Sequence, residues 1–338
     1  MGIREVARRA GVSVATVSRT INRVHPVSPE IAARVWQAIA EVGYVPNTQA
    51  RALVSGRSRI LGLIVSDITN PFFPELIHGF EQFAVEARFE VLLGSTNYDP
   101  ALMASVVRRM IERRVEGVAV MTSEMESSLL EQLTDRRVPL VFMDVAPLAP
   151  RVSNVCVDYA AGVTQAVQHL QRLGHERLAF IGGPLQLKSA RQRRDAFLHC
   201  LASYPAAPPL VLDGDHKLEG GELAVQKLLS AVPRPTAVLC SNDLTAIGVL
   251  HGLDAEGLRA PRDMSVVGFD DIHMARFTLP PLTTVRLSRA ALARLAFDAL
   301  IRDLQNPEAS PGATYRLETT LVVRASTARL GAAAPAAG

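Results

Sequence analysis

The sequence predicts an α/β protein with a small helical head and two larger lobes, each built on a doubly wound parallel sheet. From residue 60 onward, short apolar runs alternate with helical segments, which is the pattern of buried parallel strands connected by helices. Residues 1–59 instead contain only short helical patterns and no strand-like run. A chain of 338 residues is also too long for one compact core, so we expect several domains.

Three short helices are expected in the head. Residues 3–10 have one apolar side, and Gly11 suits a left-handed position after that helix. A second helix is predicted over residues 14–22. Ser28 is a good cap for a third helix, which ends at Gly43. Two short helices joined by a glycine-containing turn and supported by a third form a helix-turn-helix, although other three-helix bundles share this outline.

The second predicted helix exposes a surface suited to DNA. Its residues are short or hydrogen-bonding apart from one arginine, and small side chains allow a helix to enter the major groove. Serine, threonine and asparagine can bond phosphate oxygens, and arginine can bridge guanine O6 and N7. The exposed residues are Val14, Ala15, Thr16, Ser18, Arg19 and Asn22.

The charge distribution agrees with a polyanionic partner. Residues 1–60 hold nine arginines and three glutamates, a net charge of +6, whereas the whole chain carries only +3. A basic head on a mildly acidic body indicates binding to a polyanion, although a solvated charged face would give the same totals.

In the body, seven apolar runs are predicted to be strands and six segments to be helices. The strands are expected at 60–65, 89–94, 117–121, 140–143, 178–183, 236–240 and 265–269. The helices are expected at 74–87, 103–114, 160–173, 191–203, 220–229 and 243–256. So many strand–helix units are more than a single lobe usually contains, so we expect two similar lobes with a cleft between them.

Other classes of protein find little support in the sequence. It has no G-x-G-x-x-G after a strand, no phosphate-binding G-x-x-x-x-G-K-[ST], no H-E-x-x-H and no G-x-S-x-G, so we expect neither catalysis nor a cofactor. Three scattered cysteines fit a reducing compartment and indicate no metal site. The N-terminus lacks the apolar region of a secretory signal, and no run is long enough to cross a membrane, so a cytoplasmic location is expected.

The head resembles the LacI family of bacterial transcription regulators. The resemblance is carried by IREVARRAGVSVATVSRTIN (3–22) and VSPEIAARVWQAIAEVGYVPNTQARAL (27–53). It implies that Val14, Ala15 and Arg19 read bases and that Thr16, Ser18 and Asn22 hold phosphates. It also implies a hinge helix formed only on DNA, contributing Asn47, Ala50 and Leu53, with Leu53 as the minor-groove wedge. About eight residues cannot hold a helix unaided, which agrees with that implication.

Further landmarks of the family follow in order along the body. They are SDITNPFF (66–73), RLGHERLAFIGGP (172–184), SNDLTAIG (241–248), SVVGFDD (265–271) and PPLTTV (280–285). They imply a two-lobed fold like that of periplasmic sugar-binding proteins. The expected division is a DNA-binding domain at 1–45, a hinge at 46–58, an effector-binding and dimerisation domain at 59–330 and a disordered tail at 331–338. Within that large domain, the N-lobe is expected at about 59–158 plus 287–317 and the C-lobe at about 159–286 plus 318–330.

Ligands of open parallel sheets bind beyond the carboxyl ends of the strands, where several polar residues of this chain stand. For Asp67 and Asp243 we expect helix capping. Asn242 and Asp270 match effector-binding positions of the family, and Arg193 matches its cleft arginine, although Arg194 follows directly and breaks the usual pattern. The predicted pocket comprises Asn70, Phe72, Phe73, Asp144, Ser189, Arg193, His216, Asn242 and Asp270.

This pocket chemistry favours a sugar-like effector. One carboxylate and one guanidinium can each bridge two neighbouring hydroxyls, and phenylalanine rings suit the apolar face of a sugar or a base. His216 stands where purine- and ribose-responsive relatives have an aromatic residue. Because an imidazole stacks over less area than phenylalanine and adds a hydrogen bond, this position favours a sugar over a nucleobase. The resemblance thus implies a repressor of a carbohydrate-utilisation operon that binds palindromic operator DNA as a homodimer. A purine- or nucleoside-corepressed regulator is the alternative, followed by an enzyme or ligand carrier on the same fold.

Overall fold

The computed structural model describes residues 2–22, 26–44, 57–122, 127–144, 149–202, 209–306 and 311–331. It divides into two compact units, residues 1–59 and residues 60–338, which are described separately. The predicted hinge residues Asn47, Ala50 and Leu53 lie outside the described residues. Across the described ranges, no helix has both the length and the apolar character needed to cross a bilayer.

The head consists of the three predicted helices, α1 (Ile3–Ala10), α2 (Val14–Asn22) and α3 (Pro29–Val42). Gly11 ends α1 with a φ of 61°, a left-handed conformation that glycine adopts at little cost. The Ser28 side chain accepts a hydrogen bond from the Ile31 amide, which caps α3. Val6, Val17 and Val35, one from each helix, are fully buried and form the centre of this small core.

The described residues of the second unit form eleven strands, which lie side by side in the hydrogen-bonded order β2-β1-β3-β4-β5-β11-β10-β9-β8-β6-β7. All neighbouring strands are parallel except β10 and β11, which are antiparallel. The strands are β1 (Ile60–Val65), β2 (Glu90–Ser95), β3 (Gly117–Met121), β4 (Leu140–Met143), β5 (Val152–Asp158), β6 (Leu178–Ile181), β7 (Leu210–Leu212), β8 (Ala237–Cys240), β9 (Ser265–Asp270), β10 (Thr283–Leu287) and β11 (Thr314–Val322).

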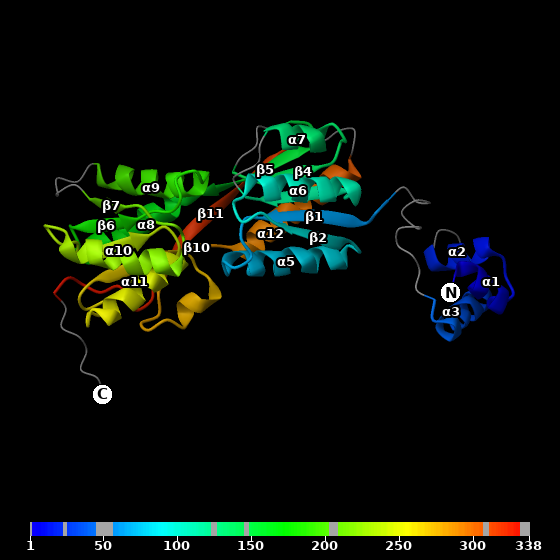
Figure 1. Ribbon diagram of the computed structural model, residues 1–338, viewed down its shortest axis with the longest axis horizontal. Helices are drawn as coiled ribbons and strands as arrows, with labels where there is room; N and C mark the ends of the chain where they lie inside the picture. Colours follow the sequence, from blue (N-terminus) through cyan, green and yellow to red (C-terminus); the bar gives the residue numbers. More distant parts are fainter. Residues whose placement is uncertain are drawn as a thin grey trace. The chain divides into compact units, whose positions relative to one another are not determined.

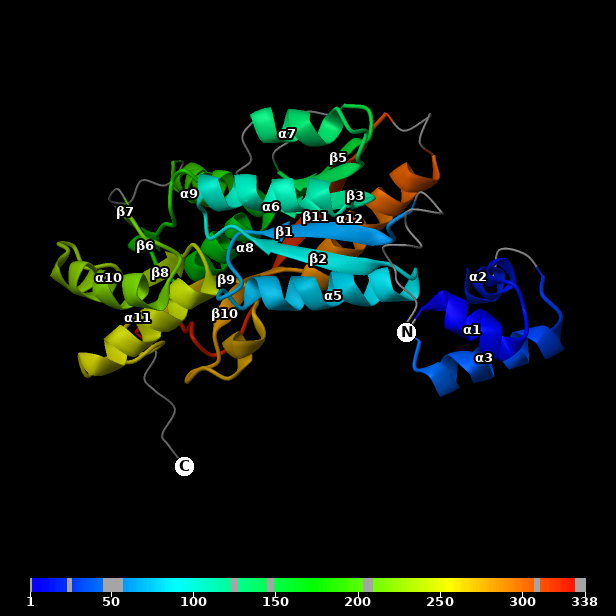
Figure 2. The same ribbon diagram turned by 45° about the vertical axis from the view of Figure 1, so that its right-hand side comes forward.

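Helices cover both faces of these strands. Figures 1 and 2 both show β1 running between α5 on one side and α6 on the other. The helices are α5 (Phe72–Glu86), α6 (Pro100–Glu112), α7 (Ser127–Thr134), α8 (Tyr159–Arg172), α9 (Lys188–Leu201), α10 (Leu218–Ser230), α11 (Asp243–Ala255) and α12 (Arg289–Gln305), with a short 3-10 turn η1 at His273–Arg276. The predicted strands and helices are all present, with ends shifted by a few residues.

Strand β11 connects the two halves of the sheet. Its residues 314–318 pair with β5, whereas residues 319–322 pair with β10 (Figure 1). The lobe boundaries given above stay a prediction, and this change of partner lies beside the boundary expected at residue 318. The strands β5, β7, β10 and β11 and the helices α7 and α12 were not predicted. The expectation of parallel sheets alone was therefore incomplete, because β11 returns antiparallel to β10.

Candidate ligand pocket and nucleic-acid interface

A cavity of about 50 Å³ lies beyond the carboxyl ends of several parallel strands of the second unit. Eight of the nine predicted ligand residues line it: Asn70, Phe72, Phe73, Ser189, Arg193, His216, Asn242 and Asp270. The sequence interpretation missed Ser66, Tyr98, Thr122, Met143, Tyr159, Leu187 and Leu287, which also line it. Ser66 and Thr122 directly follow β1 and β3. The expectation that ligands bind beyond the carboxyl ends of parallel strands could therefore have identified both residues.

Arg193 and Asp270 form a buried pair in the cavity. Their side chains are 8% and 7% exposed, and Nη2 of Arg193 lies 3.5 Å from Oδ1 of Asp270. The guanidinium is held from other sides as well, because Nη1 donates to the Ser241 carbonyl. Its Cζ lies 4.0 Å from the centroid of the Phe269 ring and 4.9 Å from that of Tyr159. Arg194 instead pairs with the exposed Asp195, so Arg193 is the arginine that enters the cleft.

Among the residues that the structure describes, two polar atoms at this site are buried without a hydrogen-bond partner, Nε of Arg193 and Oγ1 of Thr122. A buried donor left unpaired costs free energy, so such atoms are candidates for bonds to a ligand. The apolar side of the cavity includes Phe72 and Phe73, whose centroids lie 5.2 Å apart with nearly perpendicular rings. The cavity thus combines ring faces with a charged pair and unpaired hydrogen-bonding atoms.

The backbone of Asp270 has an unusual conformation. Its φ is 113°, in a region that residues other than glycine rarely adopt, and such strain persists only where the surroundings enforce it. Burial raises the pKa of Asp270 to about 6, while Arg193 and Arg289 act in the opposite direction. The carboxyl group is therefore poised to titrate not far below neutral pH.

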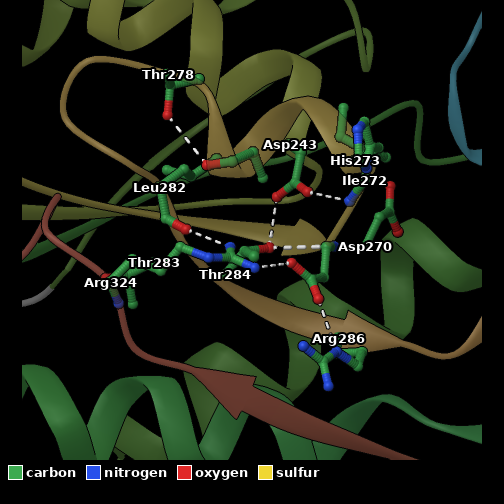
Figure 3. Close-up of polar contacts among 12 residues, drawn as sticks. Asp243, Asp270, Ile272, His273, Thr278, Leu282, Thr283, Thr284, Arg286 and Arg324 are labelled. Atoms are coloured by element: carbon green, nitrogen blue, oxygen red, sulfur yellow. Dashed lines mark hydrogen bonds and ion pairs between the residues drawn. The ribbon is translucent and has the colours of Figure 1, made fainter.

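Asp243 does not cap a helix, contrary to the expectation. It is the first residue of α11, and its carboxylate accepts hydrogen bonds from the Thr284 hydroxyl and the Ile272 amide (Figure 3). It is fully buried, and burial followed by the nearby Asp270 raises its pKa well above the usual value. Asp243 therefore fixes the backbone of the segment that follows β9 and ties it to β10.

The cap of α11 is Asn242, for which a ligand contact was expected. Its Oδ1 accepts from the Thr245 amide at 2.9 Å, and its Nδ2 donates to the His216 carbonyl at 2.9 Å. Asn242 lines the cavity, but both of its polar groups already have protein partners. Asp67 does not cap a helix either, because its carboxylate accepts from the amide and hydroxyl of Thr69 within a turn and α5 begins only at Phe72. Asn70 accepts from the Phe72 amide at the start of α5.

His216 is held as a neutral side chain. Its Nε2 lies 2.9 Å from the Ser241 hydroxyl, and its φ of 65° is again left-handed. Burial, aided by the nearby Arg193, lowers its pKa to about 3. At neutral pH the imidazole therefore offers a ring face and neutral hydrogen-bonding atoms, with no charge.

Asp144 does not line the cavity, which corrects the predicted ligand set. Its two carboxylate oxygens accept from the Val157 amide and the Tyr159 hydroxyl, both at 2.8 Å. Its carbonyl accepts from Nζ of Lys188 at 2.6 Å. Asp144 therefore fixes Tyr159, which does line the cavity. The prediction failed because the side chain after β4 turns towards β5, a choice that strand-end position alone does not specify.

The candidate DNA-reading surface lies on α2. Val14, Ala15 and Arg19 are exposed, while Val17 is buried in the core of the head. The Ser13 side chain accepts from the Thr16 amide at 3.1 Å, which caps this helix. Thr16 and Ser18 are partly exposed, and the side chain of Asn22 lies outside the described residues. The residues predicted to contact bases thus lie on the outer side of the helix.

Known protein families match both the helical head and the second unit of this chain. Residues 2–47 match the model of bacterial regulatory proteins of the lacI family, and residues 167–327 match a periplasmic binding protein-like domain. The HTH-type transcriptional repressor PurR of Haemophilus influenzae is 34% identical over 330 residues, covering 96% of this chain and 98% of the relative.

Solved structures of LacI family regulators are similar to this chain as well. The Lac repressor dimer bound to operator and the anti-inducer ONPF is 27% identical, with a TM-score of 0.86 and coverage of 97% of this chain and 99% of that one. A LacI family regulator from Enterococcus faecium with bound ribose is 28% identical, with a TM-score of 0.73 and coverage of 80% and 99%. The chain belongs to the LacI family and is a DNA-binding transcriptional repressor.

Proposed function

We propose that this repressor is controlled by a small sugar that binds between Arg193, Asp270 and the rings of Phe72 and Phe73. The observation that carries the proposal is the buried Arg193–Asp270 pair, whose Nη2 to Oδ1 distance is 3.5 Å. This loose pair leaves hydrogen-bonding capacity for neighbouring hydroxyls of a polyol. The unpaired Thr122 hydroxyl and Arg193 Nε would bond the same ligand.

The size of the cavity favours a ligand no larger than a monosaccharide. Pockets for small molecules typically measure roughly 300–1,000 Å³, so a cavity of about 50 Å³ must widen before it accepts one. A smaller ligand requires less widening. Carbohydrate utilisation is the cellular process that such an effector would report on, and the ribose held by the Enterococcus faecium relative lends support.

The second candidate is a purine or nucleoside corepressor. It is favoured by the relationship to repressors named PurR, 34% identical over 96% of this chain. Phe72 and Phe73 could stack on a base as well as on a sugar. The two candidates differ in polar chemistry, because a nucleobase offers ring nitrogens and exocyclic groups where a sugar offers several hydroxyls.

Calorimetry on the full-length protein distinguishes the candidates. We would titrate D-ribose, D-galactose and D-glucose in one series and hypoxanthine and guanine in another. Binding of a sugar that Asp270→Asn weakens, and that the exposed-site variant Asp254→Asn leaves unchanged, supports the proposal. Binding of a nucleobase alone, with the same dependence on Asp270, establishes the second candidate.

We further propose that the protein acts as a homodimer on a palindromic operator. One short recognition helix spans too few base pairs for a specific site, and two-fold symmetry doubles the contacts. The neighbouring Lac repressor structure is a dimer bound to operator, which supports the proposal. Sedimentation of the protein with and without a palindromic operator tests it, and a monomer bound to a single half-site would contradict it.

A further inference from the structure

Arg289, the first residue of α12, holds the backbone that carries Asp270. Its side chain is only 14% exposed. Nη1 donates to the carbonyl of Asp270 at 2.5 Å, and Nη2 donates to the carbonyl of Asp271 at 2.7 Å. One guanidinium therefore fixes two successive peptide groups at the end of β9.

The same guanidinium reaches helix α5. Its Nε donates to Oε2 of Glu75 at 2.9 Å, and Oε1 of Glu75 accepts from the His273 amide at 3.0 Å. Glu75 lies in the first turn of α5, the turn that begins with Phe72 and Phe73. Arg289 and Glu75 together thus join the aromatic wall of the cavity to the segment that presents Asp270.

We propose that Arg289 is a positioning residue for ligand recognition, which holds the Asp270 carboxylate in the pocket and couples it to the first turn of α5. The proposal rests on the proposed role of Asp270 in binding the effector. Asp270 and Asp271 have φ values of 113° and 55°, and these conformations must be enforced by their surroundings. The two carbonyl contacts from Arg289 supply part of that constraint, beside the ion pairs of the Asp271 carboxylate with Arg286 and Arg324.

An arginine is needed for this arrangement, and a lysine would not replace it. The planar guanidinium directs several N–H groups in fixed directions, so it can serve two carbonyls and a carboxylate at once. An ammonium group keeps the positive charge but has no fork. Comparing Arg289→Lys with Arg289→Met therefore separates the geometry of the side chain from its charge.

The charge of Arg289 also acts on the Asp270 carboxyl group. Arg193 from α9 and Arg289 from α12 both lower the pKa of Asp270, against the larger effect of burial. Ionisable groups from other elements also lie in this region. They are Asp243 of α11, whose pKa the Asp270 charge raises, Tyr159 of α8, Glu75 of α5, and Asp271, which pairs with Arg286 and Arg324. Removing the Arg289 charge should therefore raise the pKa of Asp270 above about 6.

Carbon-13 NMR of the full-length protein, labelled at the aspartate carboxyl carbons, measures this titration without any ligand. The Asp270→Asn variant assigns the signal. We expect the midpoint in Arg289→Met to lie roughly one pH unit above that of the parent protein. The matched control is Arg294→Met, because Arg294 lies on the same helix and pairs with the exposed Asp298. Its midpoint should equal that of the parent protein.

Amide exchange provides the second measurement. In Arg289→Lys the midpoint should stay near that of the parent, while residues 270–273 exchange at least several-fold faster because the fork is lost. Unchanged exchange in Arg289→Lys would overturn the positioning role, even if Arg289→Met did not fold. An unchanged midpoint in a folded Arg289→Met would also overturn it. Neither measurement needs effector, so failure of the sugar proposal would be seen separately.

Discussion

The guanidinium of Arg193 lies over the ring of Phe269, with Cζ 4.0 Å from the ring centroid. Phe269 belongs to β9 and directly precedes Asp270. Two successive residues of β9 therefore contact the guanidinium, Phe269 at its flat face and Asp270 at its Nη2 edge. A cation over an aromatic face in a desolvated site is stabilised electrostatically, which offsets part of the cost of burying Arg193. The ring therefore sets where the guanidinium can meet a ligand.

Arg193→Ala should weaken effector binding by roughly 2–4 kcal/mol, because Asp270 then loses its buried partner and the ligand loses the guanidinium. Operator affinity without effector should stay close to that of the parent, since the DNA-reading residues belong to the head. Calorimetry with the effector and operator titrations measure the two effects. Arg194→Ala is the matched control, because Arg194 pairs with the exposed Asp195 outside the cavity. Equal losses in both variants would contradict the assignment.

Asp270 should make stability depend on pH between about pH 4 and pH 6. Its folded-state pKa of about 6 lies above the 3.8 of an aspartate in an unfolded chain, so the folded protein binds this proton more tightly than the unfolded chain. Relative to Asp270→Asn, the parent protein should thus lose stability as the pH rises through this window, by on the order of 3 kcal/mol. Urea unfolding of both proteins across the window measures the difference. A constant difference would mean that the pKa of Asp270 is not raised.

Arg19→Ala should cost about 1–3 kcal/mol on the specific operator and relax the preference at one symmetric base pair. The reason is that Val14 and Ala15 offer no hydrogen-bonding side chain, which leaves the exposed Arg19 as the main reader of a base edge on α2. Binding assays at one salt concentration, on operator and on random DNA, provide the measurement and its control. Equal losses on both DNAs would show that Arg19 contacts only phosphate.

Gly248→Ala should destabilise the body by roughly 1–3 kcal/mol, because the added methyl group overpacks the contact between α10 and α11. A Cβ at this position would lie 1.9 Å from the carbonyl oxygen of Leu218, a backbone atom that cannot move aside cheaply. The control is Ser230→Ala at the exposed end of α10, which should change stability by less than about 0.5 kcal/mol. Similar melting curves for both variants would contradict the packing argument.

Some features of this protein follow from local sequence. The left-handed Gly11 and the Ser28 cap depend only on their own neighbours, so the helices of the head could be predicted within a residue or two. Continuous apolar runs such as GVAVM are buried on both faces of a sheet, which made β3 equally clear. The alternating and threonine-rich sequence of β11 is also typical of a strand, although the sequence analysis missed it. Only the tertiary structure decided that residues 314–318 pair with β5 and residues 319–322 with β10.

In the pocket, too, some residues could be predicted from the sequence, and the roles of others depend on the tertiary structure. Strand-end position predicted Asp270 at the cavity, because the chain direction of a parallel sheet determines where strands end, and the family motif predicted Arg193, which lies on α9. Strand-end position does not specify side-chain orientation. For this reason the sequence analysis missed that Asp144 bonds Tyr159 and that Asn242 caps α11. The Arg289–Glu75 pair spans 214 positions of the chain. No local preference encodes such a contact, since it exists only once α5, β9 and α12 have packed against one another.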